Sequence, residues 1–317
     1  KDLGAPDACI YTAPSAHHVT LRNNQLSDCG FGIWLHEAVE SVVVANRVAG
    51  SLEGHRSNRG NGIQVFNGQR VIVRGNLIRG GRDGIYLSAT DDSVIEGNQI
   101  EQARYGVHYM YSQRNTVSDN DCRNNSHGYA LMQSHHIVAS GNVAAYNEGH
   151  GLMFRDAYGC TIEGNQLLRN GEGFFFYSST ANVIRNNWLI QNEIGAKIWA
   201  GSLRNDVSGN RFIGNRVQIF YVATADLIWG EVEPGNFWGD YLGWDQDGDG
   251  VGDRPYRVDS FTTRLIYQYP AAALLLRSPA LELLSHLEQS LPLLRAFTVI
   301  DRKPRIDREE LGPGGEP

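Results

Sequence analysis

Short runs in which hydrophobic and polar residues alternate, separated by Gly, Asn and Asp, fill roughly the first 220 residues of the chain. Runs such as VIVRGNLI and GIYL are typical of β-strands with one buried face, and helical periodicity is almost absent before residue 260. Segments such as VIEGNQI, TIEGNQL and DVSGNRF share a fixed asparagine. That asparagine returns every 22 or 23 residues, with one interval of 30, at Asn24, Asn46, Asn76, Asn98, Asn120, Asn142, Asn165, Asn187 and Asn210.

A glycine before each short apolar run keeps the same period, at Gly32, Gly62, Gly84, Gly106, Gly128, Gly151, Gly173 and Gly195. The longer interval holds extra residues, which we place in a polar loop at residues 51–60. A repeat of this length, lacking the LxxLxLxxN pattern of leucine-rich repeats, predicts one solenoid coil per period. We therefore expect an all-β fold, a right-handed parallel β-helix of about nine 22-residue coils. The repeated Gly and Asn should tolerate left-handed backbone angles, and the Asn amides should stack between coils.

The outer surface of the solenoid is predicted from the same register. Successive strand residues point to opposite faces, so positions two and four after each repeated glycine face outward. These positions are unusually aromatic, and such an apolar stripe is typical of an interaction surface. Its aromatic members form the predicted interaction face: Trp34, Phe66, Tyr86, Phe175, Tyr177 and Trp199.

All three methionines of the chain fall on this stripe, in three successive coils. His108 lies in the same column as Met153, and two further histidines stack in a neighbouring column. Thioethers and imidazoles without hard carboxylates select a soft ion, above all Cu(I). The candidate copper ligands are His108, Met110, His127, Met132, His150 and Met153. The alternative is an apolar docking strip whose histidines are an incidental polar rim.

Composition narrows the class of protein. The net charge is −7, so no pervasive positive field attracts nucleic acid. The four cysteines show no CxxC spacing and leave the redox compartment open. No apolar run is long enough for a membrane-spanning helix, and the sequence printed here starts without a hydrophobic signal core.

An acidic loop follows the repeats. The segment DQDGDGVGD places aspartates at alternate positions around a glycine, which is the pattern of an oxygen-ligand calcium loop. Tyr256 stands where an EF-hand has its closing Glu. The candidate ligands are Asp245, Asp247, Asp249, Asp253 and the carbonyl of Val251. We expect structural Ca²⁺ that fastens the end of the solenoid; the alternative is an acidic turn without an ion.

The chain then changes character. Residues 264–297 predict short amphipathic helices, either a cap on the solenoid or a dock for another protein at the membrane surface. The docking candidates are Tyr267, Tyr269, Leu274, Leu275, Leu276, Leu281, Leu284 and Leu287. The predicted organisation is therefore a β-helix at 1–234, an acidic loop region at 235–259, a helical docking segment at 260–300 and a disordered tail at 301–317.

A family resemblance is carried mainly by residues 235–297. The coil motifs with GN and NGxG, followed by GNFWGDY, DQDGDGVGDRPY and YPAAALLLRSPALELL, resemble the NosD family of periplasmic β-helix proteins. The resemblance implies a non-enzymatic maturation factor in the periplasm, attached peripherally to the inner membrane through an ABC transporter of two membrane and two ATPase subunits. It implies delivery of copper, or of a sulfur species, for the copper centre of nitrous oxide reductase.

The same resemblance implies further partners and a longer natural chain. Cu(I) would come from a membrane-anchored copper chaperone and pass to apo nitrous oxide reductase. Members of the family carry a signal peptide and further N-terminal coils, so we expect that the first residues of the natural chain are missing from this numbering.

The competing hypothesis is an enzyme on the same fold, namely a polysaccharide lyase, epimerase or hydrolase. Such an enzyme needs clustered carboxylates with an acid and a base in a lateral groove. The outward acidic residues are scattered over several coils without a convergent pair: Asp83, Asp91, Asp92, Asp156 and Glu172. The sequence therefore favours a protein that is not an enzyme.

Overall fold

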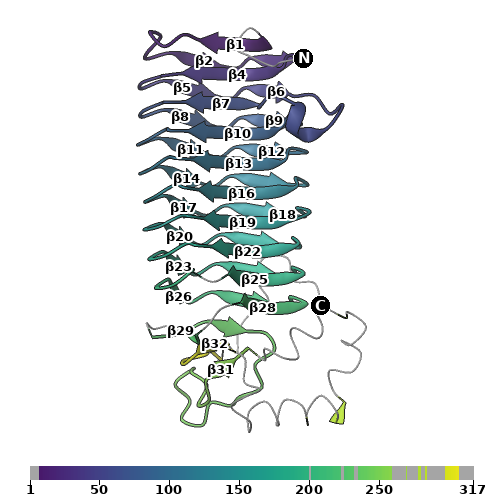
Figure 1. Ribbon diagram of the computed structural model, residues 1–317, viewed down its shortest axis with the longest axis vertical. Coiled ribbons are helices and arrows are strands. Elements are labelled where there is room, and N and C mark those ends of the chain that lie inside the picture. Colours follow the sequence, from purple (N-terminus) through teal and green to yellow (C-terminus); the bar gives the residue numbers. More distant parts are fainter. Residues whose placement is uncertain are drawn as a thin grey trace.

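The computed structural model describes residues 7–199, 201–222, 225–231, 235–258 and 297–306, together with positions 269, 278, 279 and 283. Three parallel sheets run the length of a rod, and the chain visits them in turn, one strand of each per coil (Figure 1). The parallel β-helix predicted from the repeat is confirmed. The first sheet has ten strands rather than nine, because β1 (Ala8–Thr12) precedes the first repeated asparagine.

The first sheet carries the longest strands of each coil and the outer face of interest. After β1 it contains β4 (Phe31–His36), β7 (Ile63–Phe66), β10 (Asp83–Ser88), β13 (Tyr105–Met110), β16 (His127–Met132), β19 (His150–Arg155), β22 (Glu172–Tyr177), β25 (Ile194–Trp199) and β28 (Val217–Val222).

The second and third sheets are built from shorter strands. The second contains β2 (Thr20–Arg22), β5 (Val42–Val44), β8 (Ile72–Arg74), β11 (Val94–Glu96), β14 (Thr116–Ser118), β17 (Val138–Ser140), β20 (Thr161–Glu163), β23 (Val183–Arg185) and β26 (Asp206–Ser208). The third contains β3 (Gln25–Ser27), β6 (Arg47–Ala49), β9 (Leu77–Arg79), β12 (Gln99–Glu101), β15 (Asp121–Arg123), β18 (Val143–Ala145), β21 (Gln166–Leu168), β24 (Trp188–Ile190), β27 (Arg211–Ile213) and β30 (Phe237–Trp238).

The repeated asparagines form a continuous buried ladder. The Nδ2 of Asn98 donates to Oδ1 of Asn120 at 2.9 Å, and the Nδ2 of Asn120 donates to Oδ1 of Asn142 at 3.0 Å. The predicted amide stacking is therefore confirmed. The predicted left-handed backbone at these asparagines is wrong, because the positive φ belongs to the residue before each of them, such as Ala45 or Gly97.

The repeated glycines also serve a different purpose from the one expected. Their φ angles are not positive, so conformational freedom does not explain them. A Cβ on Gly128 would lie 2.4 Å from the carbonyl oxygen of Gly151 in the next coil and 2.9 Å from Cβ of Ala144. These positions require glycine because neighbouring coils approach too closely for any side chain.

The solenoid ends in a small three-stranded sheet of β29 (Leu227–Trp229), β32 (Val299–Asp301) and β31 (Tyr256–Arg257), at the opposite end of the rod from β1 (Figure 1). Asp301 is fully buried, and its Oδ2 accepts hydrogen bonds from the backbone N and Nδ2 of Asn236, the last amide of the ladder. The third sheet includes β30, and Asp301 at the end of β32 terminates the ladder.

Two other features bear on the earlier expectations. Cys9 and Cys29 form a disulfide, a pairing that the sequence had left open, whereas Cys122 is a buried core residue. The polar insertion at residues 51–60 contains a short 3-10 helix, η2 (Arg56–Asn58). Among the described residues, no helix combines the length and the apolar character that crossing a bilayer requires.

Candidate functional site

The outer face of the first sheet brings the predicted copper residues into three neighbouring columns. Met110 is paired in register with Met132, and Ala130 is paired with both His108 and Met153. The register inferred from the repeat is therefore the register of the structure. The middle of this face is not the exposed stripe that we expected, since Ala130, Met132 and Met153 are all buried.

A small apolar cluster, separate from the solenoid core, occupies the centre of this face. It consists of Ala130, Met132 and Met153, with Met110, Tyr105 and Phe175 packed against it. Ala130 lies between His108 and Met153 in one column, with Met132 two residues along the same strand. We call this set of His108, Met110, Ala130, Met132 and Met153 the methionine cluster.

His108 is the polar member of the methionine cluster. Its side chain is 3% exposed, and its Nδ1 lies 3.0 Å from Oδ2 of Asp83. Asp83 is itself fully buried and receives two further hydrogen bonds from Arg104, at 2.8 Å to Oδ1 and 2.7 Å to Oδ2. Burial raises the pKa of Asp83, but the hydrogen bonds from His108 and Arg104 outweigh it, so the net pKa is lowered.

The tautomer of His108 follows from these contacts. An ionised carboxylate can only accept hydrogen bonds, so in the neutral ring the proton lies on Nδ1. The lone pair then lies on Nε2, which is buried and has no hydrogen-bond partner among the residues that the structure describes. A buried nitrogen of this kind is suited to bind a ligand, and a carboxylate behind the opposite nitrogen is typical of histidines that bind metals.

His127 has the opposite arrangement. Its Nδ1 lies 3.0 Å from the backbone N–H of His150 and accepts its hydrogen bond, so this lone pair is already used. The ring stacks between Tyr105, at 4.9 Å between centroids, and His150, at 4.7 Å. Burial, with the neighbouring His150, lowers the pKa of His127 to about 4. The ring is therefore neutral near pH 7.

His150 is held by a second carboxylate, that of the half-buried Glu172. Its Nδ1 lies 2.7 Å from Oε2 of Glu172, and the Nζ of Lys197 lies 3.2 Å from Oε1 of the same residue. Burial raises the pKa of Glu172, but the contacts with His150 and Lys197 lower it by more, so the net pKa of Glu172 is lowered. The ring of His150 stacks on Phe175 with centroids 4.4 Å apart.

Sequence reasoning missed the residues that hold these histidines in place. Asp83 and Glu172 were read only as scattered carboxylates, and Arg104 and Tyr105 were not considered. Asp83, Tyr105 and His127 are paired in one column immediately before the repeated glycines, and His150 is paired with Glu172. Following that column coil by coil would have found them.

The predicted interaction face flanks the methionine cluster on both sides. Trp34, Tyr86 and Phe175 are half-buried, whereas Phe66, Tyr177 and Trp199 are exposed. The docking candidates in the C-terminal segment lie outside the described residues, with the exception of Tyr269, which is 58% exposed.

The acidic loop brings together three of its five candidate ligands. Asp245, Asp247 and Asp249 each place a carboxylate oxygen within 4.8 Å of the others. Asp253 instead accepts a hydrogen bond from the backbone N–H of Gln246 at 2.8 Å, and Val251 forms a bridge with Arg305. Within the described part of the chain, this is the group of acidic side chains that could hold an ion.

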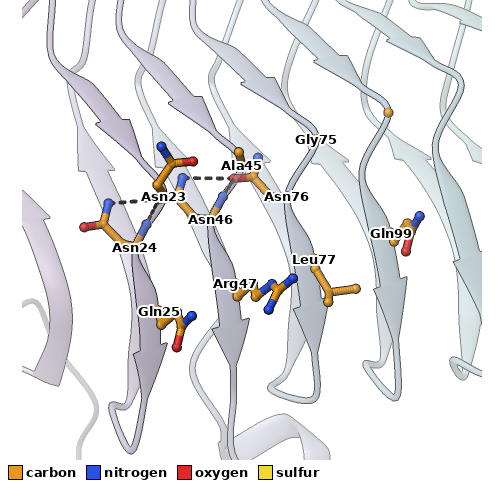
Figure 2. A pocket seen from close by; sticks show the side chains of 11 residues that line it. Asn23, Asn24, Gln25, Ala45, Asn46, Arg47, Gly75, Asn76, Leu77 and Gln99 are labelled. Atoms are coloured by element: carbon orange, nitrogen blue, oxygen red, sulfur yellow. Dashed lines mark hydrogen bonds between the residues drawn. The ribbon is translucent and has the colours of Figure 1, made fainter.

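A groove of about 600 Å³ runs beside the first rungs of the asparagine ladder (Figure 2). Figure 2 shows the amides of Asn24, Asn46 and Asn76 linked to one another, with Arg47 and Leu77 on the adjoining strands. The ladder amides in this groove are already used between coils. None of the predicted site residues lies there.

Comparisons with known proteins agree with this architecture. The solved tailspike protein Dettilon gp208 matches with a TM-score of 0.55 at 16% identity, over 69% of this chain and 54% of that one, which shows the fold alone. A relative from Pseudomonas aeruginosa, named probable ABC transporter binding protein NosD, is 42% identical over 96% of this chain and 74% of its own length. A protein of the same name from Stutzerimonas stutzeri is 38% identical over 96% and 73%. The family model for NosD, described as a periplasmic copper-binding protein, matches residues 50–243, and the chain therefore belongs to the NosD family.

Proposed function

We propose that this protein receives Cu(I) at the methionine cluster and passes it on, in the periplasm, for assembly of the copper centre of nitrous oxide reductase. The observation that carries the proposal is the buried Nε2 of His108, which has no partner among the described residues and lies beside the thioether cluster. One imidazole and three thioethers form a soft ligand set, which favours Cu(I) over divalent ions. The same set favours copper over a sulfur species as the cargo of this chain.

The proposed ligands are His108, Met110, Met132 and Met153. We leave His127 out because its Nδ1 lone pair accepts a backbone hydrogen bond. Its other nitrogen carries the proton of the neutral ring. We place His150 in the wall of the site, since Glu172 holds its Nδ1 and Phe175 covers one face of the ring.

Transfer of copper requires a partner to reach the cluster. The exposed Phe66, Tyr177 and Trp199 flank it and suit a protein contact. We propose that this face meets a membrane-anchored copper chaperone and apo nitrous oxide reductase in turn. The contact with the ABC transporter is proposed for residues 260–300, where Tyr269 and Leu283 are exposed, at 58% and 61%.

Two observations support a periplasmic location. The family is described as periplasmic, and the Cys9–Cys29 disulfide suits an oxidising compartment. The calcium site remains a prediction, supported by the three carboxylates of Asp245, Asp247 and Asp249.

The enzyme hypothesis fits this geometry poorly. Asp83 and Glu172 are the carboxylates that contact the histidines of the face, and they lie four coils apart along the rod. At about 4.8 Å per coil this separation is roughly 19 Å. The carboxylate pairs of glycosidases are about 5–9.5 Å apart. Both carboxylates are also occupied by ion pairs.

The test is a titration of Cu(I) against a chromophoric chelator under anaerobic conditions. Wild-type protein is expected to take up one Cu(I) per chain, and the triple variant M110L/M132L/M153L to lose this uptake. Ala130→Leu enlarges the side chain that lies between His108 and Met153 without removing a ligand, and it should also abolish uptake. Ala145→Leu, at a buried outward alanine of the third sheet, is the matched control. Full uptake by the triple variant would contradict the proposal.

A further inference from the structure

Asp83 and Arg104 form an ion pair on the Nδ1 side of His108. The guanidinium engages both oxygens of the carboxylate, at 2.8 Å and 2.7 Å, and Oδ2 also accepts the hydrogen bond from His108. Asp83 has no exposed side-chain surface, whereas a quarter of that of Arg104 is exposed. Tyr105 packs against the methionine cluster. The Cζ of Arg104 lies over the Tyr105 ring, 4.8 Å from its centroid.

We propose that Asp83 and Arg104 position His108 as a ligand of the methionine cluster. This inference rests on the proposed copper function. Asp83 fixes the proton of His108 on Nδ1 and thereby presents Nε2 as the ligand. Arg104 holds both oxygens of Asp83 and so fixes the carboxylate against Nδ1.

The histidines on this face supply an internal comparison. His127 accepts a backbone hydrogen bond at Nδ1, whereas His108 has the carboxylate of Asp83 at that atom. Imidazole ¹⁵N shifts distinguish the two tautomers in the protein without any copper. We expect His108 to carry its proton on Nδ1 and His127 on Nε2, with the signals assigned from H108Q and H127Q variants.

The positioning role is tested with a paired substitution. Removal of one partner would leave a buried charge unpaired, whereas D83L/R104M removes both charges together. We expect the apo variant to lose the fixed Nδ1–H signature of His108 and to bind Cu(I) about 10- to 100-fold more weakly. The matched control is D92L/R114M, which removes an exposed Asp–Arg pair of similar geometry.

Wild-type His108 protonated on Nε2, or a D83L/R104M protein that keeps both the tautomer and the Cu(I) affinity, would overturn the positioning role. Wild type that binds no Cu(I) but has the Nδ1–H tautomer would instead overturn the proposed function.

Discussion

The asparagine ladder inside the solenoid and the column of residues outside the first sheet are built by the same repeat but differ in composition. Inside, the same amide recurs in every coil and donates to the next, as Asn98 does to Asn120. Outside, the column before the repeated glycines changes at nearly every coil, with Asp83, Tyr105 and His127 in succession. The identical asparagines satisfy buried backbone groups. The different side chains of the outer column bring together functional groups that no single repeat contains.

The asparagine ladder contributes to stability, whereas the outer face carries the proposed function. The ladder fills every donor and acceptor of its amides, so it has nothing left to offer a ligand. The outer face keeps buried side-chain nitrogens without a hydrogen-bond partner among the described residues, and Nε2 of His108 is one of them. Changes to the ladder should therefore alter stability and leave the copper chemistry of the folded protein unchanged, and changes to the outer face should do the reverse.

The largest effect is expected at the ladder. Asn120→Leu removes donors to Asn142 and Ile95 and the acceptor for Asn98, and leaves buried polar groups unpaired. Each such group costs about 1–3 kcal/mol, so we expect a loss of about 3–5 kcal/mol in the free energy of unfolding. Urea denaturation measures this loss, and Cu(I) titration of the folded variant should match the wild type.

The control for that substitution is Gln99→Leu, at an exposed position of β12 in the preceding coil. Its effect should stay within about 0.5 kcal/mol. Equal destabilisation by the two substitutions would mean that the ladder adds nothing beyond ordinary strand packing.

The next largest effect is the pH dependence of the free energy of unfolding that His127 causes. The pKa of His127 is about 4 in the folded protein against an ordinary value of 6.5. His127 is therefore protonated below about pH 6.5 in the unfolded chain but only below about pH 4 in the folded chain. The free energy of unfolding falls as the pH is lowered through this range. The loss is at most about 3 kcal/mol. Urea denaturation from pH 7 to 5 should show a slope in the wild type that His127→Phe reduces.

The range above pH 5 excludes the titration of Asp83 and Glu172, and the His127→Phe variant separates His127 from His135, whose pKa burial also lowers. The pKa values of Asp83 and Glu172 are lowered, so these groups contribute stability above their ordinary values of 3.8 and 4.5, which is lost only at lower pH. An identical slope in His127→Phe would assign the pH dependence to other groups.

The two kinds of glycine give a smaller effect. In Gly128→Ala the new Cβ would collide with the backbone of the next coil, and overpacking of this kind costs about 1–3 kcal/mol. Gly97→Ala meets no atom within 4 Å but adopts a φ of +60°, and the matching position in an earlier coil is Ala45. We expect Gly97→Ala to cost about 1 kcal/mol. Thermal unfolding compares the two, and a larger effect at Gly97 would contradict the close-approach explanation.

The repeat was enough to predict the fold, the register and the location of the methionines, because each depends on a period that the sequence states directly. It could not predict that Asp301 closes the ladder, because the contact between Asp301 and Asn236 spans 65 residues outside any repeat.

The candidate site was predicted in part. Its columns follow from the alternation of strand residues, which correctly placed Met110 beside Met132. The roles of the histidines did not follow, because a tautomer depends on hydrogen-bond partners such as Asp83, and not on the position of the ring alone. Burial of Ala130 on an outward position also depends on the size of its neighbours, which the alternating pattern does not encode.

The smallest effect is expected where the acidic loop meets the end of the ladder. The backbone N–H of Ile306 donates to the carbonyl of Gly250 at 2.9 Å, so the loop is tied to the segment that carries Asp301. Calcium at Asp245, Asp247 and Asp249 should therefore stabilise the last coils. At ten times its dissociation constant, Ca²⁺ would add about 1.4 kcal/mol, which corresponds to a rise of about 2 °C in the melting temperature of a chain this size. Calorimetry with Ca²⁺ and with EDTA measures the shift, which Asp247→Asn should reduce. An equal shift in that variant would place the ion elsewhere, and no shift in the wild type would leave the loop as an acidic turn whose link to Asp301 holds without metal.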